Sequence, residues 1–599
     1  MPLDRDLESI QEARRLVEKA AEAQKILEQF TQEKIDAVVK ACAEAAQQNA
    51  EALARLAVEE TTYGVVADKV TKNLFASRDV YNAVKDMKTV GVIREDKENG
   101  VVEIAVPAGV VAAIIPTTNP TSTAIFKTLI SLKARNSVVM SPHPNAVKCI
   151  RESARILHEA AIKAGAPEGS IACLSAPTNE STQELMRHRL TSIILATGGT
   201  GLVRAAYSSG KPALGVGPGN VPSYIHSSAN IPKAVADVLT GKCFDNGTLC
   251  SSEQHMVVDA AIAPQVKGEA ERQGGFFLSA QQAEAVAGVL ILPNFRVNAK
   301  MVGQSAERIA REAGFSVPAG TRALIAPLEG IGKEHPLSAE KLSPVLSFYV
   351  VQDAREALDV CDRLLRFGGM GHTMSIHARD EKVIREFALS LHAFRMIVNS
   401  PASHGSVGYT TRLFPSMSLG CGTLGGNITT DNISPMNLLN IKRLAYERAP
   451  VNREDGTALP ERTRAHGLQA RRAPAMPATP APTPVSVRVG MIASPAAPRR
   501  PEDRAEIARL VQRFVGTAHR ASSAPAGAPA PVSAGSEPRP ATPEPHGSNG
   551  RAPRPVDFVS EDDVRTALKK GEKILVGPRT IITPSARDLG EPHEVFVRK

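Results

Sequence analysis

The sequence predicts an α/β protein whose core is a parallel sheet. Over residues 101–208, short apolar runs rich in Val and Ile alternate with segments whose apolar residues recur at helical spacing. This alternation is typical of βαβ units, which bind their ligands at the carboxyl ends of parallel strands. Residues 1–450 also have a net charge of only +2, which is typical of an ordinary globular domain.

The elements follow in order along this body. Residues 6–60 are rich in Ala, Glu, Lys and Leu and poor in Gly and Pro, which favours helices. The apolar runs predict strands over 101–106, 110–115, 137–140, 170–175 and 192–196. The segments of helical spacing predict helices over 121–133, 146–164, 180–188 and 202–208.

Length and composition exclude several classes of protein. A chain of 599 residues with 43% apolar residues can bury a large core. Seven Cys and no Cys-x-x-Cys pair argue against a disulfide scaffold and against structural zinc, so we expect no metal. We find no signal-peptide pattern, and no apolar run reaches the roughly 18 residues that a membrane span needs. We therefore expect a cytoplasmic protein.

The net charge of +9 comes mainly from the tail of the chain. Residues 451–599 carry 23 Lys and Arg against 16 Asp and Glu, a net +7, together with 21 of the 43 prolines. A basic balance is typical of proteins that bind polyanions. Here the Arg residues are spread among Pro and Ala, and acidic residues lie between them. We expect neither a nucleic-acid partner nor a membrane partner.

The tail divides into linkers and two structured pieces. Residues 451–500 and 518–556 are rich in Pro and Ala, which predicts largely disordered linkers. Residues 501–517, between them, predict an amphipathic helix with a single apolar stripe made of Ile507, Leu510, Val511, Phe514 and Val515. Residues 557–599 predict a small terminal block, with a capped helix start near Ser560 and strand-like runs at 573–576 and 580–583.

One cysteine lies in a loop of small polar residues. Cys250 follows Asp-Asn-Gly-Thr-Leu and precedes Ser-Ser-Glu-Gln, so a thiolate there is able to meet a substrate. The alternative is a buried and inert Cys, which describes most cysteines in proteins. The other six cysteines lack this setting, and we expect them to be core residues.

Two further loops follow predicted strands. Asn119 stands in Pro-Thr-Thr-Asn-Pro-Thr, directly after the strand at 110–115, where its amide N–H is able to stabilise an oxyanion. A simple Asn-Pro turn is the alternative. Residues 195–201, Leu-Ala-Thr-Gly-Gly-Thr-Gly, form a Gly-rich turn before a helix, which allows a pyrophosphate to approach the backbone. Such a turn is weak evidence by itself, because it is not a full GxGxxG motif.

Together and in this order, these motifs resemble the aldehyde dehydrogenase superfamily, and most closely its CoA-acylating branch. The resemblance covers about residues 5–450 and includes Pro-Thr-Thr-Asn-Pro-Thr-Ser-Thr at 116–123, Ser-Pro-His-Pro at 141–144, Gly-Val-Gly-Pro-Gly-Asn at 215–220 and Leu-Gly-Cys-Gly-Thr-Leu-Gly-Gly-Asn at 419–427. It implies a Rossmann-type cofactor domain, mainly residues 1–240, an α/β catalytic domain, mainly 241–425, and an oligomerisation arm within 426–450.

The resemblance also implies a role for individual residues. Cys250 is the nucleophile that attacks an aldehyde, and Asn119 holds the oxyanion together with the backbone N–H of Cys250. A hydride passes to NAD and leaves a thioester on Cys250. The residues implied to bind the cofactor are Thr117, Ser141, Pro142, His143, Thr197, Gly198, Gly199, Gly217 and Glu340. For Glu340, a carboxylate at the protein surface is the alternative.

Two departures from hydrolytic relatives point to the acylating branch. In those relatives a Glu activates the water that releases the acid, and Gly215 stands at that position here. A general base contributes about 10²–10⁴-fold, so the resemblance implies that a CoA thiol takes the acyl group instead. The Lys-Pro-x-Glu stretch that holds the adenine-side ribose is replaced by Ser-Pro-His-Pro at 141–144. NAD rather than NADP is an expectation from the family, and we expect His143 and His404 to be structural.

The tail resembles those of enzymes that are housed in bacterial microcompartments. The helix predicted over 501–517, on its Pro/Ala-rich tether, resembles an encapsulation peptide, which docks on shell or other cargo proteins. Docking on the enzyme's own body is the alternative. We thus expect a homodimeric or homotetrameric dehydrogenase inside a microcompartment that converts acetaldehyde or propionaldehyde with NAD and CoA. A hydrolytic aldehyde dehydrogenase and a non-enzymatic scaffold with a basic tail are the competing interpretations.

Overall fold

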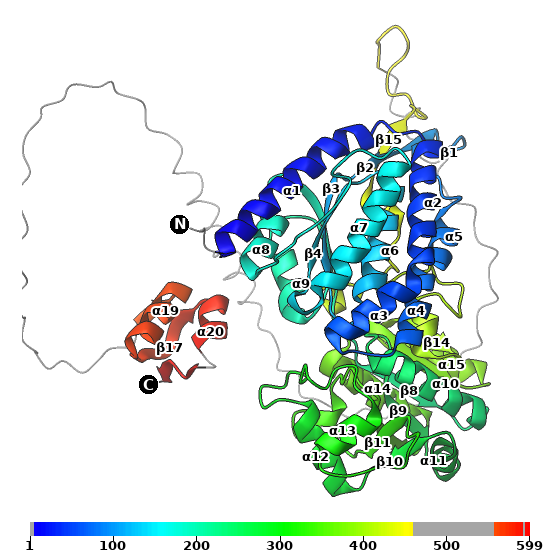
Figure 1. Ribbon diagram of the computed structural model, residues 1–599, viewed down its shortest axis with the longest axis vertical. Helices are drawn as coiled ribbons and strands as arrows, with labels where there is room; N and C mark the ends of the chain where they lie inside the picture. The colour runs from blue at the N-terminus through cyan, green and yellow to red at the C-terminus, as the bar shows by residue number, and fades with distance from the viewer. Residues whose placement is uncertain (1–4, 459–555, 591–592, 599) are drawn as a thin grey trace, which may run out of the picture. The chain divides into compact units, whose positions relative to one another are not determined.

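The computed structural model describes residues 5–458, 556–590 and 593–598 (Figure 1). They belong to two compact units, one within residues 1–477 and one within 478–599. Nearly all of the predicted linker residues and the whole helix predicted over 501–517 lie outside the described residues. In the described ranges, no helix has both the length and the apolar character that crossing a membrane requires.

The first sheet of the large unit is parallel, with the strand order β5-β4-β3-β6-β7. Side chains of β3 alternate between two hydrophobic cores, because Val111 and Ala113 pack on one side of the sheet and Ala112 and Ile114 on the other. The sheet is therefore buried on both faces, and the predicted parallel α/β class is confirmed. Its strands are β3 (Val110–Ile115), β4 (Val138–Pro142), β5 (Ile171–Cys173), β6 (Thr191–Thr197) and β7 (Ala213–Val216).

Helices cover both faces of this sheet (Figure 1). One core contains residues of α2 (Gln32–Gln48), α3 (Ala50–Thr61), α6 (Pro120–Lys133) and α7 (Val147–Lys163). The other contains or contacts residues of α1 (Arg5–Leu27), α8 (Asn179–Arg187) and α9 (Thr200–Tyr207). Every residue of α6 is buried, which gives the loop before it, the loop that carries Asn119, a rigid support.

The second sheet is also parallel, with the strand order β10-β11-β12-β9-β8-β13-β14. Its first strand in the sequence, β8, precedes residue 241, so the chain enters the second sheet within the range 1–240. The strands are β8 (Val221–Ile225), β9 (Glu253–Asp259), β10 (Gly275–Phe277), β11 (Ala323–Pro327), β12 (Val345–Val351), β13 (Gly371–His377) and β14 (Ala393–Val398).

The second sheet is likewise packed against helices (Figure 1). Three hydrophobic clusters contain both strand and helix residues. The first includes residues of α14 and α15, the second residues of α10 and α11, and the third residues of α12 and α13. The helices of this part are α10 (Ile231–Cys243), α11 (Ala263–Arg272), α12 (Ala280–Leu290), α13 (Ala306–Glu312), α14 (Ala354–Gly368), α15 (Glu381–Ser390) and α16 (Ala402–Ser406).

A continuous helical stretch packs against α6 and against the segment that leads to Cys250. It consists of α4 (Val66–Leu74), a π-helical turn at Phe75–Asp79 and α5 (Val80–Val84). At its start, the backbone N–H of Val65 donates to Asp245 Oδ1 at 2.7 Å, in the segment that leads to Cys250. The start of α4 is thereby fixed against the loop of the candidate nucleophile.

A third, antiparallel sheet has the order β1-β2-β15 and joins distant parts of the sequence. It consists of β1 (Gly91–Asp96), β2 (Val101–Pro107) and β15 (Leu439–Ala445). β15 comes from the range that we predict to be an oligomerisation arm. It lies at an edge of this sheet and is largely exposed, and its role in assembly stays a prediction.

The small unit contains a parallel sheet with the order β16-β17-β18. As predicted, Ser560 caps its first helix, because Ser560 and Asp563 bond each other's backbone N–H groups. The two runs predicted at 573–576 and 580–583 are instead one strand, which corrects that expectation. The elements are β16 (Val556–Val559), α19 (Glu561–Lys570), β17 (Ile574–Ile582), α20 (Pro584–Gly590) and β18 (Phe596–Arg598).

Candidate active site

The loop that carries Cys250 is held in an unusual backbone conformation. Asp245 and Asn246 have φ values of +50° and +52°, and Gly247 follows at +74°. Left-handed conformations cost free energy in non-glycine residues, so the contacts around this loop must compensate. Asp245 is fully buried and its carboxylate accepts several hydrogen bonds. The loop is therefore a fixed structure that presents a half-buried Cys250 just before β9.

A histidine that sequence analysis did not single out lies against the candidate nucleophile. His372 Nε2 is 3.2 Å from Cys250 Sγ, and His372 Nδ1 is 2.9 Å from Thr373 Oγ1. Burial lowers the pKa of His372 to about 3, and nearby Arg395 adds to that effect. Burial raises the pKa of Cys250 to about 12. The pair is thus a neutral thiol beside a neutral imidazole that is able to accept its proton.

Asn119 reaches the same loop from the end of β3. Its Nδ2 donates to the backbone oxygen of Thr248 at 3.3 Å and to Thr118 Oγ1 at 3.1 Å. Thr248 lies two residues before Cys250 in the sequence. The structure therefore brings the predicted oxyanion donor and the predicted nucleophile together, although one comes from the first sheet and the other from the second.

Two buried lysines of α4 connect these loops. Lys69 Nζ donates to Asp245 Oδ2 at 2.9 Å and to the Thr118 backbone oxygen at 3.1 Å. Lys72 Nζ donates to Asn119 Oδ1 at 2.5 Å and to Thr248 Oγ1 at 2.9 Å, and it also pairs with Asp245. Sequence analysis did not find these lysines, because charged residues on a helix are usually solvated.

Glu340 and the 215–220 loop complete this side of the site. The backbone N–H of Gly219 donates to Glu340 Oε1 at 3.1 Å. Desolvation raises the pKa of Glu340 to about 7. A Cβ at Gly219 would lie 2.1 Å from the backbone oxygen of Cys250, so only glycine fits there, whereas a Cβ at the predicted cofactor residue Gly217 would meet nothing within 4 Å. The loop thus places the Glu340 carboxyl near the thiol, where its charge opposes ionisation of Cys250.

The other predicted cofactor residues lie at the carboxyl ends of β3, β4 and β6. Thr117 and Ser141 are buried, and Ser141 Oγ is 2.7 Å from Thr182 Oγ1. Pro142 ends β4. The next residue, the exposed His143, has a structural contact because its Nδ1 accepts from the backbone N–H of Asn145 at 3.1 Å. These residues share the sheet edge at which parallel α/β proteins bind their ligands.

The Gly-rich turn after β6 has features of a binding surface. Thr197 Oγ1 is buried and has no hydrogen-bond partner. Gly199 is the N-cap of α9, and a Cβ at this position would meet nothing within 4 Å. Gly198 instead packs closely on Leu202, since its Cβ would lie 2.6 Å from that side chain. An unpaired hydroxyl beside an open helix N-terminus fits a polar ligand such as a dinucleotide.

Comparison with known proteins agrees with this geometry. Residues 7–273 match the aldehyde dehydrogenase family. A solved acetylating aldehyde dehydrogenase from Geobacillus thermoglucosidasius is 52% identical, with a TM-score of 0.74, and the match covers 76% of this chain and 100% of that one. The chain belongs to the aldehyde dehydrogenase family.

Two further relatives are less similar in sequence, and one of them is also longer than this chain. The bifunctional aldehyde-alcohol dehydrogenase AdhE of Escherichia coli is 44% identical over 442 residues, which are 73% of this chain and 50% of that protein. The chain thus spans about half the length of the bifunctional relatives that it matches. A propionaldehyde dehydrogenase from the Clostridium phytofermentans fucose utilisation bacterial microcompartment is 29% identical, with a TM-score of 0.66 over 72% of this chain and 97% of that one.

This aldehyde dehydrogenase has no room for a carboxylate at Gly215. A Cβ there would lie 2.7 Å from Val203 Cγ1 and 3.0 Å from Tyr207 Cε2. The backbone N–H of Gly215 donates to the Tyr207 hydroxyl at 3.1 Å, which fixes the ring in that place. The position at which the resemblance expects a hydrolytic Glu is therefore filled by neighbouring side chains.

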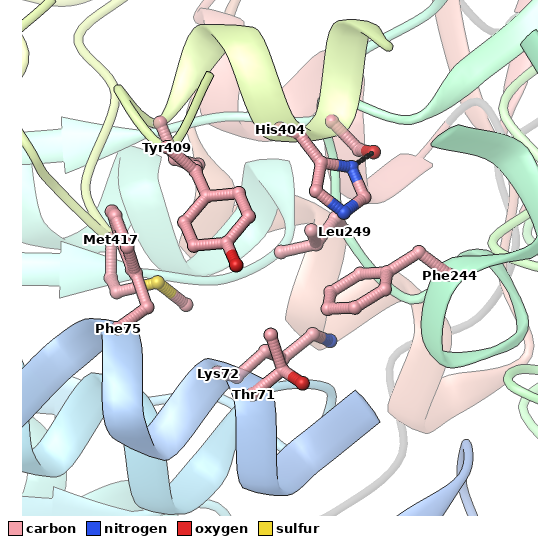
Figure 2. A pocket seen from close by; sticks show the side chains of 10 residues that line it. Thr71, Lys72, Phe75, Phe244, Leu249, His404, Tyr409 and Met417 are labelled. Carbon is pink, nitrogen blue, oxygen red and sulfur yellow. Dashed lines mark hydrogen bonds between the residues drawn. The ribbon is translucent and has the colours of Figure 1, made fainter. Parts of the chain in front are cut away.

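A small apolar cavity lies beside the nucleophile loop of this aldehyde dehydrogenase (Figure 2). Its volume is about 20 Å³, and it opens towards solvent. Beside it, the ring of His404 contacts the rings of Phe244 and Tyr409. His404 Nδ1 is 2.9 Å from Ser403 Oγ, away from the Cys250–His372 pair. The lining residues are Thr71, Lys72, Phe75, Phe244, Leu249, Ser403, His404, Val407, Tyr409 and Met417.

Proposed function

We propose that this aldehyde dehydrogenase is CoA-acylating: it oxidises a short-chain aldehyde with NAD and CoA to an acyl-CoA and NADH. The observation behind the proposal is the contact of Cys250 with His372, in a loop that Asn119 bonds at Thr248, while Gly215 stands where the resemblance expects the general base of hydrolytic relatives. A small cavity lined by aromatic and aliphatic side chains, next to Leu249, suits a short aliphatic aldehyde. Acetaldehyde and propionaldehyde are the substrates that we expect.

In the first step, Cys250 Sγ attacks the aldehyde carbon. As the S–C bond forms, the thiol proton passes to His372 Nε2, and the carbonyl oxygen becomes an oxyanion. Asn119 Nδ2 and the backbone N–H of Cys250 stabilise that charge, a contribution that is worth about 10²–10³-fold per donor in other enzymes. The proton moves only as the S–C bond forms, because a thiol with a pKa of about 12 does not protonate an imidazole with a pKa of about 3 in the resting site.

The residues at the strand ends of the first sheet would hold the dinucleotide, with Thr197, Gly198 and Gly199 at the N-terminus of α9 and Glu340 beside the reacting sulfur. The unpaired Thr197 hydroxyl and the open space at Gly199 support that fit. When bound, NAD supplies the hydride acceptor. The carbon attached to Cys250 loses a hydride and becomes a thioester. NAD rather than NADP is part of the proposal and rests on the family resemblance, because the Ser-Pro-His-Pro stretch holds no acidic residue that would exclude the 2′-phosphate of NADP.

In the last step, the thiol of CoA attacks the thioester. The new S–C bond forms on CoA sulfur and the Cys250–carbon bond breaks. Cys250 Sγ takes back the proton that His372 holds, and the proton of the CoA thiol is released to solvent as the one proton of the overall reaction. Water is the competing nucleophile. It lacks a base at position 215, where Val203 and Tyr207 occupy the space.

The rate of NADH formation tests the proposal directly. The purified full chain is mixed with propionaldehyde and NAD, with and without CoA, and the products are separated by chromatography. We expect CoA-dependent NADH formation and propionyl-CoA as the product. Equal rates without CoA, together with propionate, would establish the hydrolytic alternative. No turnover in either mixture would favour the scaffold alternative.

We also propose that the chain is cytoplasmic microcompartment cargo and a homodimer or homotetramer. The sequence of 501–517, which lies outside the described residues, supports the first part through its apolar stripe. The similarity to a propionaldehyde dehydrogenase from a microcompartment supports it as well. The test is a fusion of residues 501–517 to a fluorescent protein in shell-forming cells. Puncta are expected, and a diffuse signal contradicts targeting. Light scattering of the purified chain measures the oligomeric state.

A further inference from the structure

We propose that Lys72 is a positioning residue for the reaction: its ammonium group fixes the orientation of the Asn119 side-chain amide, so that Nδ2 and not Oδ1 faces the oxyanion. This inference rests on the proposed function, because that function gives Asn119 its role. Lys72 acts through Asn119 and through the nucleophile loop, without a bond to the reacting atoms.

The hydrogen bonds of Lys72 define which way the amide points. An ammonium group has three N–H donors and no acceptor. Lys72 Nζ directs them to Asn119 Oδ1 at 2.5 Å, to Thr248 Oγ1 at 2.9 Å and to Asp245 Oδ2. A rotated amide would bring the Nδ2 hydrogens against an ammonium that is unable to accept them. The contact with Lys72 therefore allows one orientation only.

In that orientation, the Asn119 donor faces the nucleophile loop. Nδ2 bonds the Thr248 backbone oxygen at 3.3 Å, two residues before Cys250. The opposite orientation would present Oδ1 to a developing negative charge, and the two would repel each other. Asn119 therefore acts as an oxyanion donor only if its amide is held in the first orientation, and Lys72 holds it there.

Lys72 forms contacts between three parts of the structure. It belongs to α4, Asn119 precedes α6, and Asp245 with Thr248 forms the nucleophile loop. Lys72 is 4% exposed and Asp245 0% exposed, so solvent does not screen these contacts. Figure 2 shows Lys72 and Thr71 on α4, across the cavity from His404 and Tyr409. The lysine thus fixes the relative position of donor and nucleophile at the wall of the cavity that we assign to the aldehyde.

Neighbouring charges set the protonation of Lys72. Asp245 and, more distantly, Asp68 stabilise the ammonium, whereas Lys69 opposes it. The ammonium in turn disfavours protonation of His404. Burial is the largest effect, and it lowers the pKa of Lys72 to about 8. A neutral amine keeps two N–H donors and gains a lone pair, so it no longer satisfies all three acceptors, and it would accept from a rotated amide.

Lys69 offers a matched control on the same helix. It is three residues away, equally buried, and bonded to the same Asp245 carboxylate oxygen at 2.9 Å. Its other bond, at 3.1 Å, is to the backbone oxygen of Thr118 and not to the Asn119 side chain. A variant at Lys69 therefore removes a charge from Asp245 without removing the contact that orients the amide.

The experiment is a double-mutant cycle on the full chain, with kcat/KM for propionaldehyde as the readout. We expect Lys72→Met to lower kcat/KM by about 10- to 100-fold, the size of a misplacement effect. Asn119→Ala should lower it by about 10²–10³-fold. If Lys72 acts through Asn119, the double variant is no worse than Asn119→Ala alone. Lys69→Met should have a smaller effect, and one that multiplies with that of Asn119→Ala.

Two outcomes would overturn the proposal. One is a double variant whose loss equals the product of the single losses. The other is a Lys69→Met variant that behaves as Lys72→Met does, including its coupling to Asn119→Ala. An Asn119→Ala variant with wild-type kcat/KM would instead remove Asn119 from the proposed mechanism itself. Should Lys72→Met fail to fold, Lys72→Gln, which removes the ammonium group and leaves Asp245 paired with Lys69, replaces it in the cycle.

The pH profile gives an independent readout. In the wild type, kcat/KM should fall as pH rises above about 8, because Lys72 loses its proton there. That alkaline decline should be absent from Lys72→Met. Lys69→Met should retain it but at a higher pH, because removal of the Lys69 charge raises the pKa of Lys72. Identical alkaline profiles in the wild type and in Lys72→Met would contradict the role of the ammonium.

Discussion

Replacement of His372 by alanine tests whether the imidazole accepts the thiol proton. His372 Nε2 is 3.2 Å from Cys250 Sγ, within reach of a direct proton transfer. With a thiol pKa of about 12, a free thiolate makes up only about one molecule in 10⁵ at neutral pH. Attack without a base therefore depends on a very rare species, whereas attack with a base uses the abundant neutral thiol.

The expected loss follows from the usual contribution of a general base. His372→Ala should lower kcat/KM for the aldehyde by about 10²–10⁴-fold, which is about 3–5 kcal/mol of transition-state stabilisation. The pH profile should change as well. With a pKa of about 3, the wild-type imidazole stays neutral from pH 6 to 9, the range of the assay, so titration of His372 adds no pH dependence there. In the variant, kcat/KM should rise about tenfold per pH unit as the thiolate fraction grows, up to about pH 8, where Lys72 begins to lose its proton.

The assay is NADH formation with saturating NAD and CoA, measured as a function of pH and aldehyde concentration. His404→Ala is the control, because His404 lines the cavity but bonds Ser403 and not Cys250. That variant should keep the shape of the wild-type pH profile. A His372→Ala enzyme that retains kcat/KM within about threefold of wild type, with the same profile, would refute the assignment of His372 as the base.

Three further predictions concern packing around the site. Gly215→Glu should lower the melting temperature and should not raise carboxylate production, because its Cβ would lie 2.7 Å from Val203; carboxylate as the main product would contradict this. Gly219→Ala should reduce turnover strongly, since its Cβ would lie 2.1 Å from the Cys250 backbone oxygen; wild-type kcat would show that the loop adapts. Tyr409→Ala enlarges the cavity and should shift the ratio of kcat/KM for hexanal over acetaldehyde upwards, and an unchanged ratio would place the aldehyde elsewhere.

Much of the first sheet is predictable from local sequence. Each strand is a short apolar run, and β3 has the predicted bounds, 110–115. The expectation failed in the small unit, where Gly577 and Pro578 suggested a turn between two strands. They lie instead within β17, between Val576, which pairs with Val556, and Ile581, which pairs with Phe558. The extra residues form an irregularity in the pairing, and Pro is tolerated at such a position.

Sequence analysis found the site residues that belong to recognisable motifs. It missed the residues that enter the site only through tertiary contacts. Cys250 and Asn119 stand in loops of small residues with a recognisable order. His372 begins a buried strand of ordinary composition, and its contact with Cys250 spans 122 residues of sequence. Lys69 and Lys72 follow an Asp on a short polar helix, which favours a solvated face. Only the fold shows that this face is buried against Asp245.

The dependence of product release on CoA tests the central claim most directly. The enzyme is mixed in one turnover with NAD and propionaldehyde, and Cys250 is then examined by mass spectrometry before and after CoA is added. We predict a propionyl thioester on Cys250 that persists in water and disappears with CoA as propionyl-CoA forms. A thioester that hydrolyses to propionate at the same rate without CoA, or no acyl group on Cys250 at all, would contradict an acylating mechanism through this cysteine.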